Sequence, residues 1–296
     1  MNSSRRTTAA LTLILLASFG LLYRHVIAKL MYDWENDGNY SHGFLIVPLA
    51  LYLAWERRDR LIAAVKRPSP LGLVVVVGSL MTLVAGVLGA ELFLSRTSMI
   101  GLLAGTILFV LGWEHFKILL FPICFLFLMV PIPAIIFNQI AFPLQLIASR
   151  FGEATLNLAN IPVLREGNVI MLANTTLEVA EACSGIRSLV SLLTLGIVYS
   201  YFTDHRGWVR VLVSLSTIPT AIIANGIRVA GIGIAAHYYG PEVATGFVHT
   251  FSGWVLFVVA FAILFAVMHA VHLMSPPTRG GAPVNTAVPR PKEAVL

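Results

Sequence analysis

The sequence has little charge and very little cysteine, and both shortages limit what the protein can be. Charged residues make up only 11% of the 296 residues, against roughly 25% in soluble proteins. Hydrophobic residues make up 57%, and the mean hydropathy is +0.84. Two cysteines cannot build a disulfide scaffold. The composition excludes a disulfide-rich secreted domain and an ordinary soluble enzyme, and it indicates an integral membrane protein.

The net charge of +6 does not indicate a nucleic-acid partner, because the basic residues fall between apolar runs, as a topology signal requires. The densest basic cluster, residues 56–67, is therefore expected in the cytoplasm. Residues 1–28 begin like a signal peptide, but no small-residue cleavage pattern follows the apolar run. We expect an uncleaved signal-anchor helix with a cytoplasmic N-terminus, and no cofactor or bound metal.

Apolar runs predict an all-α polytopic membrane protein with about eight transmembrane helices and both termini in the cytoplasm. The expected helices cover residues 9–23, 44–55, 71–90, 99–113, 118–136, 186–202, 208–224 and 251–271. Three prolines should kink or break the fifth helix near its outer end. Residues 229–248 are glycine-rich and too interrupted to predict a full crossing. The transmembrane domain is expected to span residues 1–274, followed by a flexible cytoplasmic tail, 275–296.

Residues 138–182 differ in character from the apolar runs around them. Residues 140–158 predict an amphipathic helix on the outer surface. Residues 161–180 carry β-branched side chains around the turn Arg165-Glu166-Gly167-Asn168, which is typical of a β-hairpin or two short strands. Because open strands cannot face lipid, this segment is expected to form a small periplasmic insertion of an amphipathic helix and a β-hairpin.

Cys183 lies where polar residues meet an apolar helix. Ser184 and Gly185 follow it, and a long apolar run begins at Ile186. A cysteine before a helix start faces unpaired backbone N–H groups and the positive end of the helix dipole, which favour the nucleophilic thiolate. The alternative is a small buried apolar residue, the commoner role of cysteine in membrane helices.

Arg228 and His249 are expected to lie on the same outer face as Cys183, at the ends of the seventh and eighth helices. The three would supply a nucleophile, a permanent cation and a proton carrier. An arginine beside apolar sequence is costly to bury and is a functional candidate, although a snorkelling arginine is an alternative. Histidine is common at membrane interfaces, so His249 is weaker evidence by itself.

Four blocks of the sequence resemble the exosortase family, eight-helix bacterial relatives of the archaeosortases. They are Asn39-Tyr40-Ser41-His42-Gly43, Glu181-Ala182-Cys183-Ser184-Gly185-Ile186-Arg187-Ser188-Leu189, Pro219 with Asn225-Gly226-Ile227-Arg228, and His249. The cysteine block is specific. Each of the other three is weak singly, and they become convincing because they follow one another in that order along the chain. The resemblance implies a cysteine transpeptidase or protease of the inner membrane, active on the periplasmic side and often encoded with exopolysaccharide functions. Its substrates would carry a C-terminal PEP-CTERM tail: a Pro-Glu-Pro type motif, one transmembrane helix and a basic cluster.

In this interpretation Cys183 forms an acyl-thioester, Arg228 stabilises the thiolate and the oxyanion, and His249 carries the proton. The opposite assignment, with Arg228 as proton donor, stays open, although a guanidinium is a poor donor near neutral pH. His42, Tyr40, Glu181 and Asn225 are second-tier candidates that structural contacts would equally explain. The acceptor that resolves the thioester is unknown. A non-catalytic subunit of a polysaccharide exporter and a membrane acyltransferase are the alternative functions.

Overall fold

The computed structural model describes residues 3–173, 175–179, 186–240, 242 and 247–275. Of the described residues, 81% are helical, and six of the described helices are long and apolar enough to cross a membrane. Two further apolar helices, Gly43–Glu56 and Leu189–Thr203, are shorter. The prediction of an all-α polytopic membrane protein is confirmed. The count of eight crossings stays a prediction, as do the domain limits.

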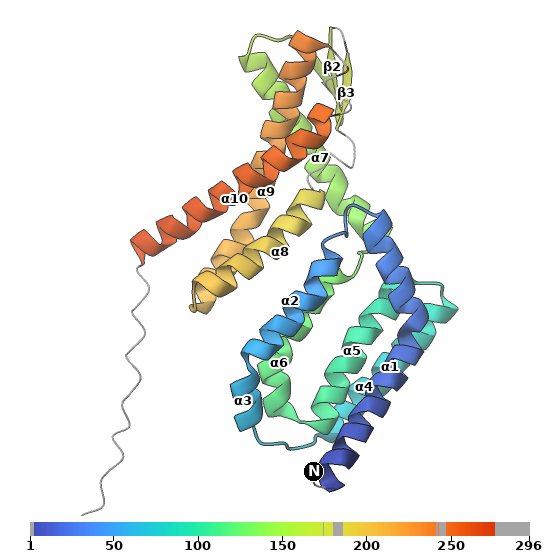
Figure 1. The fold of residues 1–296 in the computed structure, drawn as a ribbon. Helices are drawn as coiled ribbons and strands as arrows, with labels where there is room; N and C mark the ends of the chain where they lie inside the picture. Colours follow the sequence, from blue (N-terminus) through green and yellow to red (C-terminus); the bar gives the residue numbers. More distant parts are fainter. Residues whose placement is uncertain (1–2, 174, 180–185, 241, 243–246, 276–296) are drawn as a thin grey trace, which may run out of the picture.

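The first half of the chain forms one group of helices (Figure 1). It contains α1 (Ser3–Asn36), α2 (Gly43–Glu56), the short α3 (Arg58–Ala63), α4 (Pro70–Leu88), α5 (Leu92–Val110), α6 (Trp113–Phe125) and the 3-10 turn η1 (Leu126–Met129). Glycine lets α4 and α5 approach closely, since a Cβ at Gly72 would lie 2.2 Å from the backbone nitrogen of Phe109. Apolar side chains of α1, α2, α5 and α6 form the core of this group.

α5 begins at Leu92, seven residues before the predicted start. The Glu91 side chain caps it by accepting a hydrogen bond from the Leu94 N–H at 2.9 Å. The earlier start places Arg96 inside the helix, where only 2% of the residue is exposed. Arg96 forms an ion pair with Asp33 of α1, and Lys29 binds the same carboxylate at 2.9 Å. The predicted bounds, which left residues 91–98 outside the helices, were therefore wrong here, because a polar cap extends the helix beyond its apolar run.

The predicted fifth helix, residues 118–136, is not continuous. α6 ends at Phe125, η1 follows, and the chain from Val130 to Pro133 is not helical. The break that the prolines predicted is confirmed, although Pro122 itself lies inside α6. Residues 134–136, which were assigned to the same helix, belong to the next one.

The second half contains α7 (Ala134–Leu158), a three-stranded antiparallel sheet, α8 (Ile186–Thr203), α9 (Gly207–Tyr239) and α10 (Phe247–Met274). The sheet order is β1 (Val163–Glu166), β2 (Val169–Leu172) and β3 (Thr176–Glu178), so the predicted hairpin gains a third strand. Gly167 makes the first turn at a φ of +61°. Apolar residues of α7, the sheet and α9 form one buried cluster. The predicted amphipathic helix is longer than expected and packs on α9.

α9 corrects the prediction for the seventh helix, which was expected to end at residue 224. It continues for 33 residues to Tyr239, so Arg228 lies in the helix interior and not at its end. Gly233, which belongs to the stretch that was taken as interrupted, is a packing site, as is Gly226 just before that stretch. A Cβ at Gly226 would lie 2.7 Å from Phe151, and one at Gly233 would lie 3.0 Å from Leu156, both on α7. Small residues here allow two helices to approach closely.

α8 joins the two halves of the molecule. Towards the first half, the Tyr201 hydroxyl donates a hydrogen bond to Glu56 at 2.9 Å, and its ring stacks on Phe121 at 5.0 Å. Towards the second half, Leu192 is fully buried in a cluster with α9 and α10. Figure 1 shows α8 (yellow) between α2 and the α9–α10 pair.

Candidate active site

Arg228 of α9 reaches across to α10. Its Nε donates a hydrogen bond to the Ser252 hydroxyl at 3.0 Å. The helical backbone satisfies its own hydrogen bonds, so the side chains are left to join the two helices. Fixing Nε to a hydroxyl orients the planar guanidinium fork, which carries donors in a rigid geometry.

A cavity of about 270 Å³ opens beside this contact. α9 and α10 each supply five of its lining residues, and nearly all are apolar. They are Ala224, Ile227, Arg228, Gly231 and Ile232 from α9, and Phe251, Ser252, Val255, Leu256 and Val259 from α10. Arg228 and Ser252 are therefore polar groups in apolar surroundings, the arrangement that is typical of a binding or reaction site.

His249 lies three residues before Ser252 in α10, so the two residues share one face of that helix. At 1.5 Å per residue, their Cα atoms are separated by about 4.5 Å along the axis. The helix backbone at His249 is described, whereas its side chain lies outside the described part. The structure thus brings the His249 turn of α10 next to the residue that Arg228 contacts.

Cys183 and Glu181 lie outside the described residues. The chain on either side of them is placed, since Val179 precedes them and Ile186 begins α8. Val179 is buried in the same cluster as Val229, the neighbour of Arg228. Asn168 holds it there, accepting from the Val179 N–H at 2.9 Å and donating through its side-chain amide to the Val179 carbonyl at 3.2 Å. Four residues span at most about 14 Å, which limits how far Cys183 can lie from Val179.

The second-tier candidates Tyr40 and His42 lie elsewhere. Both are in the loop between α1 and α2, where the Tyr40 hydroxyl accepts from the Ile132 N–H and His42 Nε2 lies 3.1 Å from the Leu128 carbonyl oxygen. Burial raises the pKa of the Tyr40 phenol and lowers the pKa of the His42 imidazole. These contacts tie the loop to the broken end of α6, so the structure gives both residues a packing role. Asn225 is buried in α9, one turn before Arg228.

Sequence reasoning missed Ser252. A single serine between apolar residues carries no motif, and only the position of α10 against α9 singles it out. It also missed Asp204, which is almost fully buried between α8 and α9 and binds Arg206 and His272. A charged residue in so apolar a chain was itself a signal, but Asp204 was not singled out.

The helices, the cavity and the charged side chains inside them define a polytopic membrane protein with a polar site between two long helices. The comparison with protein families gives a narrower result. The family model described as transmembrane exosortase matches residues 34–266, and the chain belongs to that family. The match includes the positions of Cys183, Arg228 and His249. Members of this family are generally similar to cysteine transpeptidases. No curated protein and no solved structure matches the chain.

Proposed function

We propose that this exosortase-family protein is a membrane cysteine protease or transpeptidase. It cleaves the C-terminal PEP-CTERM-type tails of exported proteins through an acyl-thioester on Cys183. The observation that carries the proposal is the Arg228–Ser252 contact over a cavity, one turn from His249. Arg228 and Ser252 lie on the consecutive helices α9 and α10, and their contact supports a site that includes the nearby turn with His249.

The first half of the reaction is acyl transfer to the enzyme. His249 takes the Cys183 thiol proton, and Sγ attacks the carbonyl carbon at the sorting motif to form a carbon–sulfur bond. The carbonyl oxygen becomes an oxyanion, which the permanent charge of Arg228 stabilises. When the carbonyl re-forms, the carbon–nitrogen bond breaks, and the leaving amine takes the proton from His249.

The second half releases the product. An acceptor, either water or an amine, gives a proton to His249 and attacks the thioester carbonyl. The carbon–sulfur bond then breaks and the thiolate is restored. Histidine, with a reference pKa near ~6.5, can both accept and donate the proton near neutral pH. For Arg228, a fixed charge is the better-supported role, since its guanidinium stays protonated.

The length of α9 supports a site at one face of the membrane. Arg206 and Arg228 are 22 positions apart, which is about 33 Å of helix, close to the ~30 Å hydrocarbon thickness of a bilayer. With Arg206 at the cytoplasmic surface, Arg228 reaches the periplasmic surface. The proposal includes cytoplasmic termini, and PEP-CTERM-tailed proteins as the partners that the site cleaves.

The test is co-expression with a reporter protein that carries a Pro-Glu-Pro type tail. The wild-type protein should shorten the reporter on a gel, and Cys183→Ala should not. A transient thioester would be released by hydroxylamine from the wild-type protein only. Processing by Cys183→Ala would exclude this mechanism and every other thioester mechanism. If the reporter stays unprocessed and a labelled lipid thioester forms, the result would favour the membrane acyltransferase. If neither product forms, the result would favour a non-catalytic export subunit.

A further inference from the structure

The third strand of the sheet has one edge with which no described strand pairs. β3 pairs with β2 on one side, in the register Ile170 opposite Leu177. The sheet order β1-β2-β3 leaves its other side without a neighbouring strand among the described residues. An edge of this kind is a template for another extended chain, because its N–H and C=O groups point outwards unpaired.

Two hydrogen bonds identify the outward groups. The Leu172 N–H donates to the Thr175 carbonyl at 2.8 Å, and the Val179 N–H donates to the Asn168 carbonyl at 2.9 Å. Antiparallel pairs alternate between hydrogen-bonded and non-hydrogen-bonded, so residues 175, 177 and 179 bond to β2. The N–H and C=O of Thr176 and Glu178 therefore point away from the sheet. Among the described residues, no further backbone hydrogen bond reaches these four groups.

Packing holds this edge in place. Leu177 and Val179 are buried, at 8% and 2% exposure, in the cluster that also contains Val229 of α9. Thr176 and Glu178 alternate with them and are exposed. A strand that is already fixed in the extended conformation loses little freedom when a peptide pairs with it, which favours binding.

The edge of β1 at the other side of the sheet differs. Arg165 of β1 forms a 2.6 Å ion pair with Glu153 of α7 and donates to the Gly167 carbonyl. Long charged side chains beside a strand edge discourage pairing with another chain. The two edges therefore offer an internal comparison within one small sheet.

We propose that the outer edge of β3 binds an extended segment of the peptide substrate as a fourth strand. The inference rests on the proposed function, because it takes the occupant to be the segment that Cys183 attacks. Glu178 precedes Cys183 by five residues, which span at most about 18 Å. A peptide paired with Thr176 and Glu178 makes main-chain hydrogen bonds that give affinity without requiring a particular sequence.

The first test removes one outward N–H group. Glu178→Pro deletes a donor that β2 does not use, and proline is tolerated on edge strands. It should raise KM for the tailed reporter by roughly tenfold, the effect of losing one hydrogen bond, while kcat changes little. Val163→Pro is the matched control, because it removes an outward N–H from the opposite edge, on β1, and it should match the wild type.

The second test needs no activity. In a Cys124→Ser, Cys183→Ala protein, Thr176→Cys is paired with single cysteines placed along the reporter tail. A strand on this edge gives disulfide cross-links at every second tail position, because successive side chains point to opposite faces. Cross-links without this alternation, or between two copies of the protein alone, would overturn the inference.

The two proposals fail differently. If wild-type protein leaves the reporter uncleaved, the proposed function fails. If wild-type protein cleaves it and Glu178→Pro keeps the wild-type KM with a wild-type melting temperature, only the β3 inference fails. If Glu178→Pro lowers the melting temperature, its KM does not test the β3 inference. The alternation of the cross-links, which is measured without that substitution, then decides it.

Discussion

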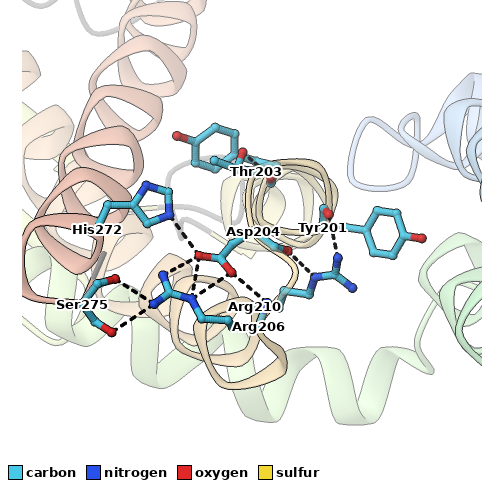
Figure 2. A network of polar contacts seen from close by, with 8 residues as sticks. Tyr201, Thr203, Asp204, Arg206, Arg210, His272 and Ser275 are labelled. Carbon is cyan, nitrogen blue, oxygen red and sulfur yellow. Dashed lines mark hydrogen bonds and ion pairs between the residues drawn. The ribbon is translucent and has the colours of Figure 1, made fainter. Parts of the chain in front are cut away.

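The two ends of the α9–α10 pair both use an arginine to join the helices, and the two joints differ in chemistry. At the start of α9, Arg206 binds the Asp204 carboxylate at 2.6 Å and the Ser275 carbonyl at 2.7 Å, while His272 binds the same carboxylate at 3.0 Å (Figure 2). Further along, Arg228 binds the Ser252 hydroxyl beside a cavity. Arg206 binds a carboxylate, whereas the contact between Arg228 and Ser252 borders a cavity.

The contrast separates a structural arginine from a candidate catalytic one. The Asp204 side chain is only 1% exposed, and Arg210 donates to the Asp204 backbone carbonyl at 2.6 Å, so an ion pair and side-chain to backbone hydrogen bonds close the turn between α8 and α9 (Figure 2). A charge that a carboxylate neutralises is poorly suited to stabilising a second anion. Arg228 lines a cavity, and the proposed reaction would place its oxyanion there.

The largest expected effect is on activity at the Arg228 end. Arg228→Ala should lower reporter cleavage by roughly 10²–10³-fold, as for the loss of an oxyanion donor, with little change in melting temperature. Arg228→Lys keeps the charge and should retain more activity than Arg228→Ala. Arg206→Ala is the matched control and should do the reverse, lowering the melting temperature in detergent but sparing kcat. Equal loss of activity in Arg206→Ala and Arg228→Ala would remove the distinction between the two ends.

His249→Ala should lower the cleavage rate by about 10²-fold or more, the usual contribution of a proton carrier. The residual activity should also lose the ionisation that falls near the histidine pKa in the wild-type rate profile. Cleavage rate against pH, in membranes or detergent, measures both effects. An unchanged profile would show that His249 is not the proton carrier and would favour Arg228 in that role.

Asp204→Asn should lower the stability of the α9–α10 pair at its Arg206 end and leave the rate of reporter cleavage unchanged. The substitution breaks the ion pair with Arg206, and the cost is moderated because Arg206 and His272 are partly exposed and can be hydrated. The melting temperature should fall by roughly 5–10 °C. A wild-type melting temperature in this variant would mean that the Asp204 network does not hold the helices together.

The same variant has a pH signature. Hydrogen bonds from the Arg206 guanidinium hold the pKa of the Asp204 carboxyl well below its usual range. A depressed folded-state pKa stabilises the protein above the unfolded value, near ~3.9, and this stabilisation is lost as the pH falls through the folded value. The melting difference between wild type and Asp204→Asn should therefore be constant near neutral pH and narrow below about pH 4.

Ser252→Ala should have a smaller effect, a loss of roughly tenfold in kcat from one missing hydrogen bond. The expected cause is poorer orientation of Arg228, so the same substitution should have almost no effect in an Arg228→Ala background. Ser252→Thr keeps a hydroxyl and should recover most of the activity. Equal losses in the two backgrounds would mean that Ser252 acts independently of Arg228.

The smallest effect is expected at Cys124, which belongs to neither end of the pair. It is exposed on α6, in the first half of the molecule. Cys124→Ser should leave reporter processing within about twofold of the wild type, since exposed substitutions away from a site usually have little effect. Comparable losses in Cys124→Ser and Cys183→Ala would contradict the assignment of Cys183 as the nucleophile.

Sequence reasoning was most accurate where a long apolar run and a charged turn coincide, as at α4 and α10. It failed at α9, because the glycine-rich residues 229–248 looked too interrupted for a helix, whereas Gly233 and the nearby Gly226 let α7 approach α9 closely. It failed at α5 because the Glu91 cap extends the helix through the buried Arg96. For the site, sequence supplied Arg228 as a residue, but its partner Ser252 depends on how α9 and α10 cross. That crossing is a tertiary property, which neither hydropathy nor charge encodes locally.

α8 has a mechanical consequence. The helix is 18 residues long, about 27 Å. Its far end is fixed by Tyr201, which binds Glu56 and stacks on Phe121. Its near end begins three residues after Cys183. Over this length, a tilt of about 2° moves the near end by about 1 Å, and a 1 Å misplacement can cost on the order of 100-fold in rate. The packing of Tyr201, far from the proposed reaction, therefore restrains the tilt of α8 and with it the position of the proposed nucleophile.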